Sequence, residues 1–111
     1  MTKAKIERIA NDLGWSVYWE KYSNGVKSVL FRKYSPAGQD FNMEIYYKNL
    51  DELASKIDDY YESFDPSQEA YYWLGSDGHG KNGAPDTMGE VYDDMVSCEE
   101  MIRDLYDALV A

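Results

Sequence analysis

The spacing of the hydrophobic residues changes along the chain, and this change constrains the fold more than any other feature of the sequence. In residues 2–13 these residues follow the i, i+3, i+4, i+7 spacing of one helix face, and Gly14 follows as a stop signal (Ile6, Ile9, Ala10, Leu13). From Trp15 to Trp19 apolar and polar residues alternate instead, which is the period of a half-buried strand. The sequence therefore predicts a helix followed by a sheet.

A β-hairpin is predicted next, because residues 24–25 are Asn-Gly, the preferred pair for a two-residue type I′ turn. This turn would place Trp19 opposite Leu30 and Tyr18 opposite Phe31, with aromatic side chains on both faces of the hairpin. Residues 35–38 read as a loop, and a third strand follows with alternating hydrophobic residues (Phe41, Met43, Ile45).

The second half of the chain reads as helical. One apolar stripe predicts a helix after Asn49 (Leu50, Leu53, Ile57, Tyr60, Tyr61, Phe64), and Asp65 followed by Pro66 predicts the start of a short helix through Leu74. Residues 87–94 read as a short helical segment, and the capping-box pattern of residues 97–100 predicts the start of a last helix. We expect one α+β domain over residues 1–111: an N-terminal helix, a three-stranded antiparallel sheet, then three to four mostly acidic helices, in the order α-β-β-β-α-α-α.

The charges are distributed unevenly. Eleven Lys and Arg against 21 Asp and Glu give a net charge of −10, which disfavours direct binding to nucleic acid. Residues 1–50 hold eight basic and five acidic side chains (+3), whereas residues 51–111 hold three basic and sixteen acidic ones (−13). One cysteine, together with no leader or long apolar run, indicates a protein of the reducing cytoplasm.

A charge of −13 in one half exceeds what solubility needs, so a basic protein partner is a reasonable explanation. Duplex DNA carries one charge per ~1.7 Å of its axis, so thirteen charges correspond to roughly 22 Å of duplex. The sequence therefore suggests a DNA mimic. The carboxylates expected to replace phosphates, and the tyrosines expected to anchor the partner, are Asp58, Asp59, Glu62, Asp93, Asp94, Glu99, Glu100, Asp104, Asp107, Tyr61, Tyr72 and Tyr92.

Other chemistry has weaker support. Residues 78–83 match Gly-x-Gly-x-x-Gly, but the strand before and the helix after that a dinucleotide site needs are not predicted, so a turn-rich connector is the alternative. His79 is the only histidine, and Cys98 has acidic neighbours, so an exposed histidine and a buried cysteine are expected rather than catalytic groups. The acidic pairs match no Ca²⁺ loop. We expect no cofactor, no metal and no enzymatic activity.

Two short resemblances suggest a biological setting. Residues 64–66 (Phe-Asp-Pro), Glu69, Trp73, the Gly-Ala-Pro of residues 83–85 and the acidic residues 90–105 resemble the C-terminal portion of ArdA-type antirestriction proteins, over residues 64–111. This resemblance implies an acidic DNA mimic from a mobile element that occupies the DNA site of a restriction enzyme. Residues 35–41 and 78–85 are similar to segments of small proteins of phages and conjugative elements, a likeness that names no activity.

Three functional hypotheses follow. The first is an inhibitor in the bacterial cytoplasm that blocks the DNA-binding site of a restriction enzyme or CRISPR–Cas effector through its acidic half. The second is a protein-interaction module or homodimer that uses the hairpin face around Tyr18, Val29 and Phe31. The third, an enzyme using Asp77, His79 and Lys81, is the least favoured. None requires contact with a membrane or with nucleic acid.

Overall fold

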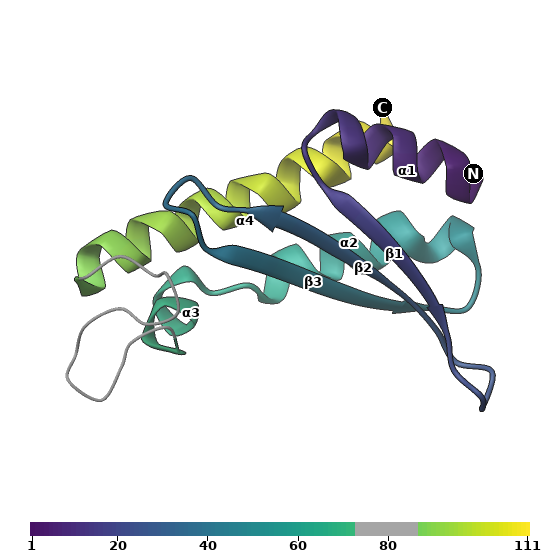
Figure 1. Cartoon of the computed structure of the whole chain (residues 1–111), viewed down its shortest axis with the longest axis horizontal. Coiled ribbons are helices and arrows are strands. Elements are labelled where there is room, and N and C mark those ends of the chain that lie inside the picture. Colours follow the sequence, from purple (N-terminus) through teal and green to yellow (C-terminus); the bar gives the residue numbers. More distant parts are fainter. Residues whose placement is uncertain (73–86) are drawn as a thin grey trace.

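A three-stranded antiparallel sheet and four α-helices make up the fold, in the α+β order that the sequence predicts (Figure 1). The computed structural model describes residues 1–72 and 87–111. Its elements are α1 (Lys3–Asp12), β1 (Ser16–Lys21), β2 (Lys27–Tyr34), β3 (Asp40–Tyr47), the 3₁₀-helix η1 (Leu50–Glu52), α2 (Leu53–Ser63), α3 (Pro66–Tyr72) and α4 (Met88–Val110).

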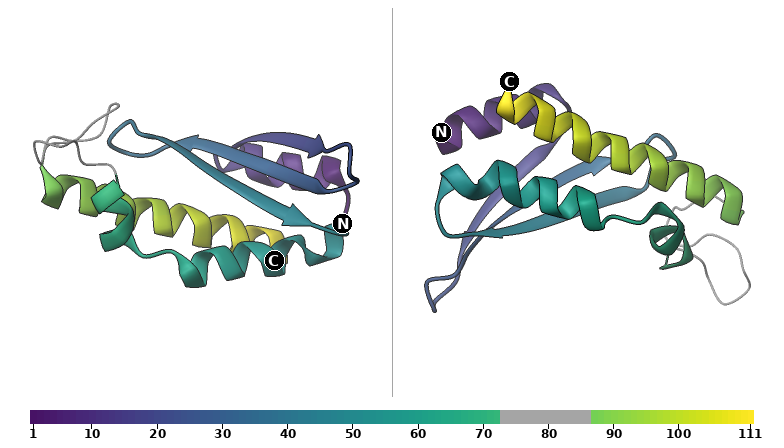
Figure 2. Two further views of the ribbon diagram at one scale, coloured as in Figure 1. Left: turned by 90° about the horizontal axis from the view of Figure 1, so that it is seen from below. Right: turned by 180° about the vertical axis from the view of Figure 1, so that it is seen from behind.

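The helices cover only one face of the sheet. Strand order is β1-β2-β3, and the right-hand view of Figure 2 shows α1, α4 and α2 side by side on one face of the sheet; within residues 1–72 and 87–111 no helix lies on the other face. Buried and exposed residues alternate in β3 because its odd-numbered side chains from Phe41 to Tyr47 face the helices and the others point away from them. The described residues thus form two layers with one sheet face open.

The core lies between these two layers. The strands contribute large buried side chains such as Trp15, Phe31 and Met43, and the helices contribute Ile57 and Ile102 among others. The rings of Trp15 and Phe31 meet edge to face, with 6.2 Å between centroids. Full burial of each side chain of this size contributes about 1.5–3 kcal/mol, so the sheet depends on its helical layer for stability.

A side-chain contact fixes α1 against β1. The Nε1 group of Trp19 donates a hydrogen bond to Glu7 Oε1 at 2.5 Å, and Lys3 Nζ lies 5.1 Å from the centroid of the same ring. The cation and the carboxylate both come from α1 and both engage one strand residue. This contact explains why Trp19, on a strand at the edge of the sheet, remains partly buried.

The predicted register of the hairpin is wrong by one residue. In the structure Val17 pairs with Phe31 and Trp19 pairs with Val29, whereas the type I′ turn placed Tyr18 opposite Phe31. The loop has three residues between Tyr22 and Val26, not two, because the Tyr22 N–H donates to the Val26 carbonyl at 2.8 Å.

The three-residue loop ends in Gly25, which has positive φ. The φ of Gly25 is +85°, and its N–H donates to the Tyr22 carbonyl at 2.9 Å. This is the geometry of a type I turn followed by a left-handed glycine. A shift of one residue moves every side chain to the other face, so the observed register gathers Val17, Trp19, Val29 and Phe31 on the helix side.

The predicted break before residue 97 is also wrong, since α4 runs without interruption from Met88 to Val110. Ser97 is inside the helix, and its hydroxyl donates to the Asp93 carbonyl at 3.3 Å instead of capping a new helix. The true N-cap is Thr87, whose Oγ1 accepts from the Glu90 N–H at 3.2 Å. Thr87 and Glu90 are three residues apart, so they have the same capping-box spacing as residues 97–100.

The predicted start of the short helix is confirmed. The Asp65 carboxylate accepts from the Ser67 N–H at 3.0 Å, and Pro66 is the first residue of α3. The described part of α3 ends at Tyr72, so residues 73–74 of the predicted helix lie outside the described residues.

Candidate functional site

Most of the predicted acidic residues lie on the outer surface of α2 and α4, which pack against each other in the helical layer (Figure 2). The side chains of Asp58 and Glu99 are partly buried, and the others are exposed (Asp59, Glu62, Asp93, Glu100, Asp104, Asp107). We call these eight residues the acidic face. Eight of the nine carboxylates that the sequence suggested therefore lie on α2 and α4, outside the core.

Four members of the acidic face form one line along α4. Asp93, Glu100, Asp104 and Asp107 are separated by seven, four and three residues, which places them on the same side of an α-helix. At 1.5 Å per residue this line is about 21 Å long. The apolar side chains of α4 point the opposite way into the core, so the line faces outward.

Asp94 is the exception, and its assignment to the binding surface is wrong. Its side chain is buried, and its carboxylate accepts hydrogen bonds from Ser35 Oγ (2.5 Å), the Ala37 N–H (3.0 Å) and Gln39 Nε2. All three donors belong to the turn between β2 and β3. Asp94 therefore holds that turn against α4 and is not available to a partner.

Sequence reasoning missed Arg103, a cation within the acidic face. Its Nε lies 3.1 Å from Asp107 Oδ1, and one of its terminal nitrogens lies 4.0 Å from Asp58 Oδ1. Its guanidinium also lies 5.5 Å from the ring centroid of Tyr61 and 5.2 Å from that of Tyr106. The four-residue spacing of Arg103 and Asp107 was a readable signal for the first of these pairs.

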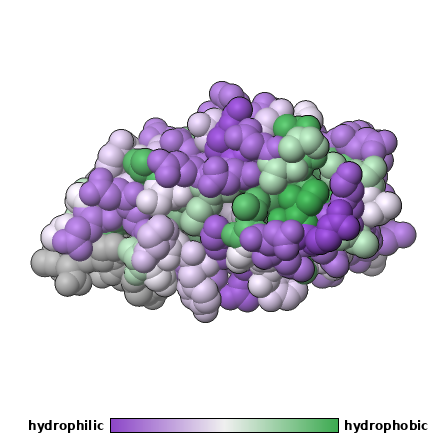
Figure 3. All heavy atoms as spheres, turned by 90° about the horizontal axis from the view of Figure 1, so that it is seen from above, coloured by the Kyte–Doolittle hydropathy of each residue, from purple (hydrophilic) through white to green (hydrophobic). Residues whose placement is uncertain are grey.

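With Arg103 included, the acidic face has eight carboxylates and one cation, a balance of −7. Its free charge lies mainly on Asp59, Glu62, Asp93, Glu100 and Asp104, which have no ion-pair partner among the described residues. In Figure 3, which shows the molecule from above, hydrophilic residues cover much of the surface, and an apolar patch lies toward α1 and the C-terminal end of α4.

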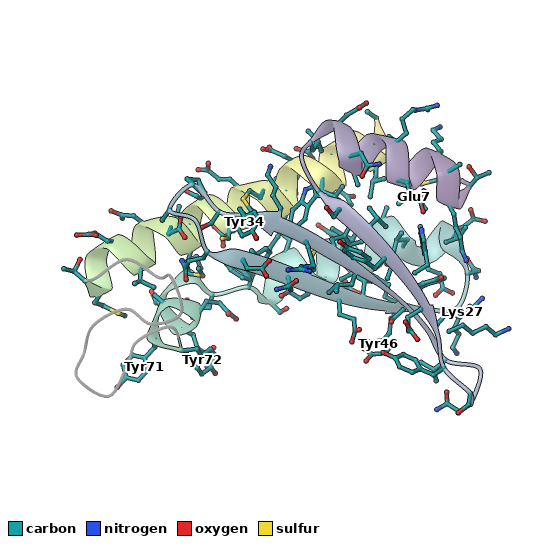
Figure 4. All side chains as sticks on the ribbon, viewed as in Figure 1. Glu7, Lys27, Tyr34, Tyr46, Tyr71 and Tyr72 are labelled. Carbon is teal, nitrogen blue, oxygen red and sulfur yellow. The ribbon has the colours of Figure 1, made fainter. Side chains whose placement is uncertain are left out.

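The three proposed tyrosine anchors differ in their surroundings. Tyr61 packs partly against the core beneath Arg103, and Tyr92 on α4 is 40 % exposed. Tyr72 is also exposed but belongs to α3, where Figure 4 shows it beside Tyr71 and extending away from α4. Tyr92 is therefore the anchor best placed to contact a partner at the acidic face, because it neighbours Asp93.

The surface of the second hypothesis does not exist as one face. Val29 and Phe31 are fully buried on the helix side, whereas Tyr18 projects from the open side. The open sheet face carries other exposed rings, with Tyr34 at 69 % and Tyr46 at 53 % exposure (Figure 4). Sequence reasoning missed this tyrosine surface because the predicted register was shifted by one residue.

Cys98 is a buried free thiol, as the sequence suggested. Burial, together with the carboxylates of Asp94 and Glu69, raises the pKa of Cys98 to about 12. A thiol of this pKa is almost fully protonated at neutral pH, so it is a poor nucleophile. The packing of α4 thus removes Cys98 from the list of reactive groups.

Several predicted features cannot be placed. Asp77, His79, Lys81 and the glycine-rich residues 78–83 lie outside the described residues. Within residues 1–72 and 87–111, no three His, Cys, Asp or Glu side chains are arranged to hold a metal ion. No helix in the same ranges is long and apolar enough to cross a membrane.

Comparison with known proteins found no family model, no curated protein and no solved structure that matches this chain. The geometry and charge of the surface are therefore the features that bear on function.

Proposed function

We propose that the acidic face binds the DNA-binding site of a bacterial defence protein, a restriction enzyme or a CRISPR–Cas effector, and thereby blocks DNA entry. The main observation in favour is the line of carboxylates along α4, which extends for about 21 Å with its neighbours on α2 beside it. Most of these charges form no ion pair with the cations that the structure describes, so they remain available to attract a basic partner.

The density of charge supports mimicry of one strand of a duplex. The four carboxylates of the line divide about 21 Å into three intervals, which is one charge per about 7 Å along α4. DNA has one charge per ~3.4 Å on each strand and one per ~1.7 Å on both strands together. The line alone therefore has about half the charge density of a single strand, and Glu99 with the three carboxylates on α2 supplies the remaining negative charge of the acidic face.

The choice of a defence protein as target rests on the resemblance of residues 64–111 to ArdA-type antirestriction proteins. Such enzymes bind DNA through basic surfaces, and a face of −7 would accelerate encounter with a surface of this kind by long-range attraction. The attraction weakens with salt, since the Debye length falls from ~10 Å at 0.1 M to ~3 Å at 1 M.

The test is a DNA-cleavage assay with a type I restriction enzyme and with a purified Cas9 effector, with and without this protein. We expect the double variant Glu100→Lys and Asp104→Lys to inhibit at least tenfold more weakly than the unchanged chain, because it reverses two adjacent charges on the line.

The matched control is Asp12→Lys with Glu20→Lys, which makes the same change in net charge at exposed positions of α1 and β1. This control should inhibit almost normally. Equal loss in both double variants would show that only net charge matters and would refute a specific acidic face. Inhibition of neither enzyme by the unchanged chain would refute the proposed targets.

A second candidate function is supported by the open sheet face. Tyr18, Tyr34 and Tyr46 are each more than half exposed there, which is unusual for a surface without a partner. The binding of a protein to this face would depend little on salt and would be lost in Tyr34→Ala, whereas Glu100→Lys would leave this binding unchanged. The reverse pattern would exclude this candidate.

A further inference from the structure

An open groove of about 840 Å³ lies at the end of the sheet where the hairpin projects. Its walls come from the β1–β2 turn, the end of β3 and the first turn of α2. β2 begins opposite the last residue of β3, so the hairpin turn extends beyond the third strand and leaves space beside it. The volume is within the ~300–1,000 Å³ range of small-molecule sites.

Three lysines from three different elements line this groove. Lys27 comes from β2, Lys48 from the segment after β3, and Lys56 from α2. Glu52 is the one acidic residue of the lining, and its carboxylate already accepts a hydrogen bond from Asn49 Nδ2 at 3.2 Å. The local balance is therefore +2 in a chain whose net charge is −10.

The positive charge in this region has no internal partner. Lys21 and Lys27 lie directly opposite each other in the β1–β2 ladder, an arrangement that is destabilising for like charges. Among the residues that the structure describes, no carboxylate forms an ion pair within 4.0 Å of either lysine or of Lys48 and Lys56. A bound anion would relieve this repulsion.

Two aromatic rings accompany the lysines. Lys27 Nζ lies 5.5 Å from the ring centroid of Tyr47, which holds the ammonium group at the wall of the groove. Tyr46 is half exposed, and the neighbouring carboxylate of Glu44 raises the pKa of its hydroxyl to about 12. Figure 4 shows Lys27 and Tyr46 at the same end of the molecule. A flat ring of a ligand can stack on such a side chain.

The net charge of the chain limits which anions fit. A nucleic acid or a second copy of this chain would extend beyond the groove and be repelled by the remaining acidic surface. A compact anion stays close to the lysines, and charges farther away than the Debye length of ~8 Å at 0.15 M salt are largely screened. The groove therefore favours a small ligand with several negative charges.

We propose that this groove is a binding site for a nucleoside polyphosphate, with Lys27, Lys48 and Lys56 contacting the phosphates and the ring of Tyr46 stacking on the base. The site is separate from the acidic face and does not depend on the function proposed for it. Phosphate oxygens are strong acceptors for ammonium groups, and the ring gives a nucleoside an advantage over phosphate alone.

The test is calorimetric titration of the full chain with ATP, tripolyphosphate and adenosine, without divalent cations. We expect saturable binding of one ATP, weaker binding of tripolyphosphate and little binding of adenosine. The double variant Lys48→Gln and Lys56→Gln should weaken ATP binding by at least roughly tenfold. Tyr46→Leu should weaken the binding of ATP and leave that of tripolyphosphate unchanged.

The control is Lys5→Gln with Arg8→Gln, which removes the same charge from exposed positions of α1. It should change ATP affinity by less than twofold, and circular dichroism should show all variants folded. Absence of ATP binding at millimolar concentration would overturn the proposal, and so would equal weakening in the control. If tripolyphosphate binds as tightly as ATP and Tyr46→Leu has no effect, the nucleoside part of the proposal is wrong.

Discussion

Replacing Asp94 by alanine should destabilise the protein more than any other change of an acidic residue in α4. The buried carboxylate accepts three hydrogen bonds from the turn between β2 and β3, and each bond to a charged group contributes ~1.5 kcal/mol or more. Ala37 is exposed, so water can replace one of the three bonds, while the polar groups of Ser35 and Gln39 remain buried without their acceptor. We expect Asp94→Ala to lower the free energy of unfolding by about 3–5 kcal/mol.

The assay is urea unfolding followed by circular dichroism, with Asp93→Ala as the matched control. Asp93 is the neighbouring residue of the same type, but it is exposed, so its loss should change stability by no more than ~0.5 kcal/mol. Asp94→Asn keeps one carbonyl acceptor and should fall between the two. If Asp94→Ala and Asp93→Ala unfold at the same urea concentration, the carboxylate does not hold the turn and the reasoning fails.

Three further predictions concern local structure. Thr87→Ala should cost about 1 kcal/mol of stability in thermal or urea unfolding, because it removes the N-cap of α4. Ser97→Ala should cost less than half of that. A larger cost for Ser97→Ala than for Thr87→Ala would indicate that a helix starts at residue 97. Gly25→Ala should destabilise by ~1–2 kcal/mol because φ is +85° there, whereas Gly89→Ala, in a helix with open space around it, should stabilise by up to ~1 kcal/mol; equal effects in the same unfolding assay would contradict the turn geometry. In the folded protein the pKa of Cys98 is raised to about 12, so the stability that this shift contributes is complete below the unfolded pKa near 9 and is lost as pH rises from 9 toward 12. The free energy of unfolding, measured across this range, should depend less on pH in Cys98→Ala than in the unchanged chain. An identical pH profile in both proteins would show that the pKa of the thiol is not raised by folding.

The hairpin shows how far the sequence determines a strand register. The Asn-Gly pair indicates a tight turn, yet it is compatible with a two-residue loop and with a three-residue loop ending in a left-handed glycine. The two loops differ in length by one residue, which the Asn-Gly pair does not reveal. The apolar pattern does contain the answer, because only the observed register puts Trp19 and Phe31 on the same side of the sheet.

Asp94 shows how much of the candidate site the sequence can predict. Asp93 and Asp94 look alike in the sequence, but Asp94 is three residues after Val91 and four before Cys98, and therefore lies on the apolar side of α4. Helical phase was enough to predict its burial. Its donors were not predictable, because Ser35 and Gln39 are 59 and 55 residues away in the chain. The exposure of the other acidic residues of α4 needed only helical phase.

The position of α4 at the end of the order of elements has a consequence for synthesis. This helix supplies more of the buried core than any other element, and it follows all three strands in the chain. While the ribosome is still making residues 88–110, the buried side chains of this helix are not yet available to the core that they share with the strands. Folding of the sheet is therefore completed only after α4 has left the exit tunnel, and a chaperone that binds apolar strands would have its substrate during that interval.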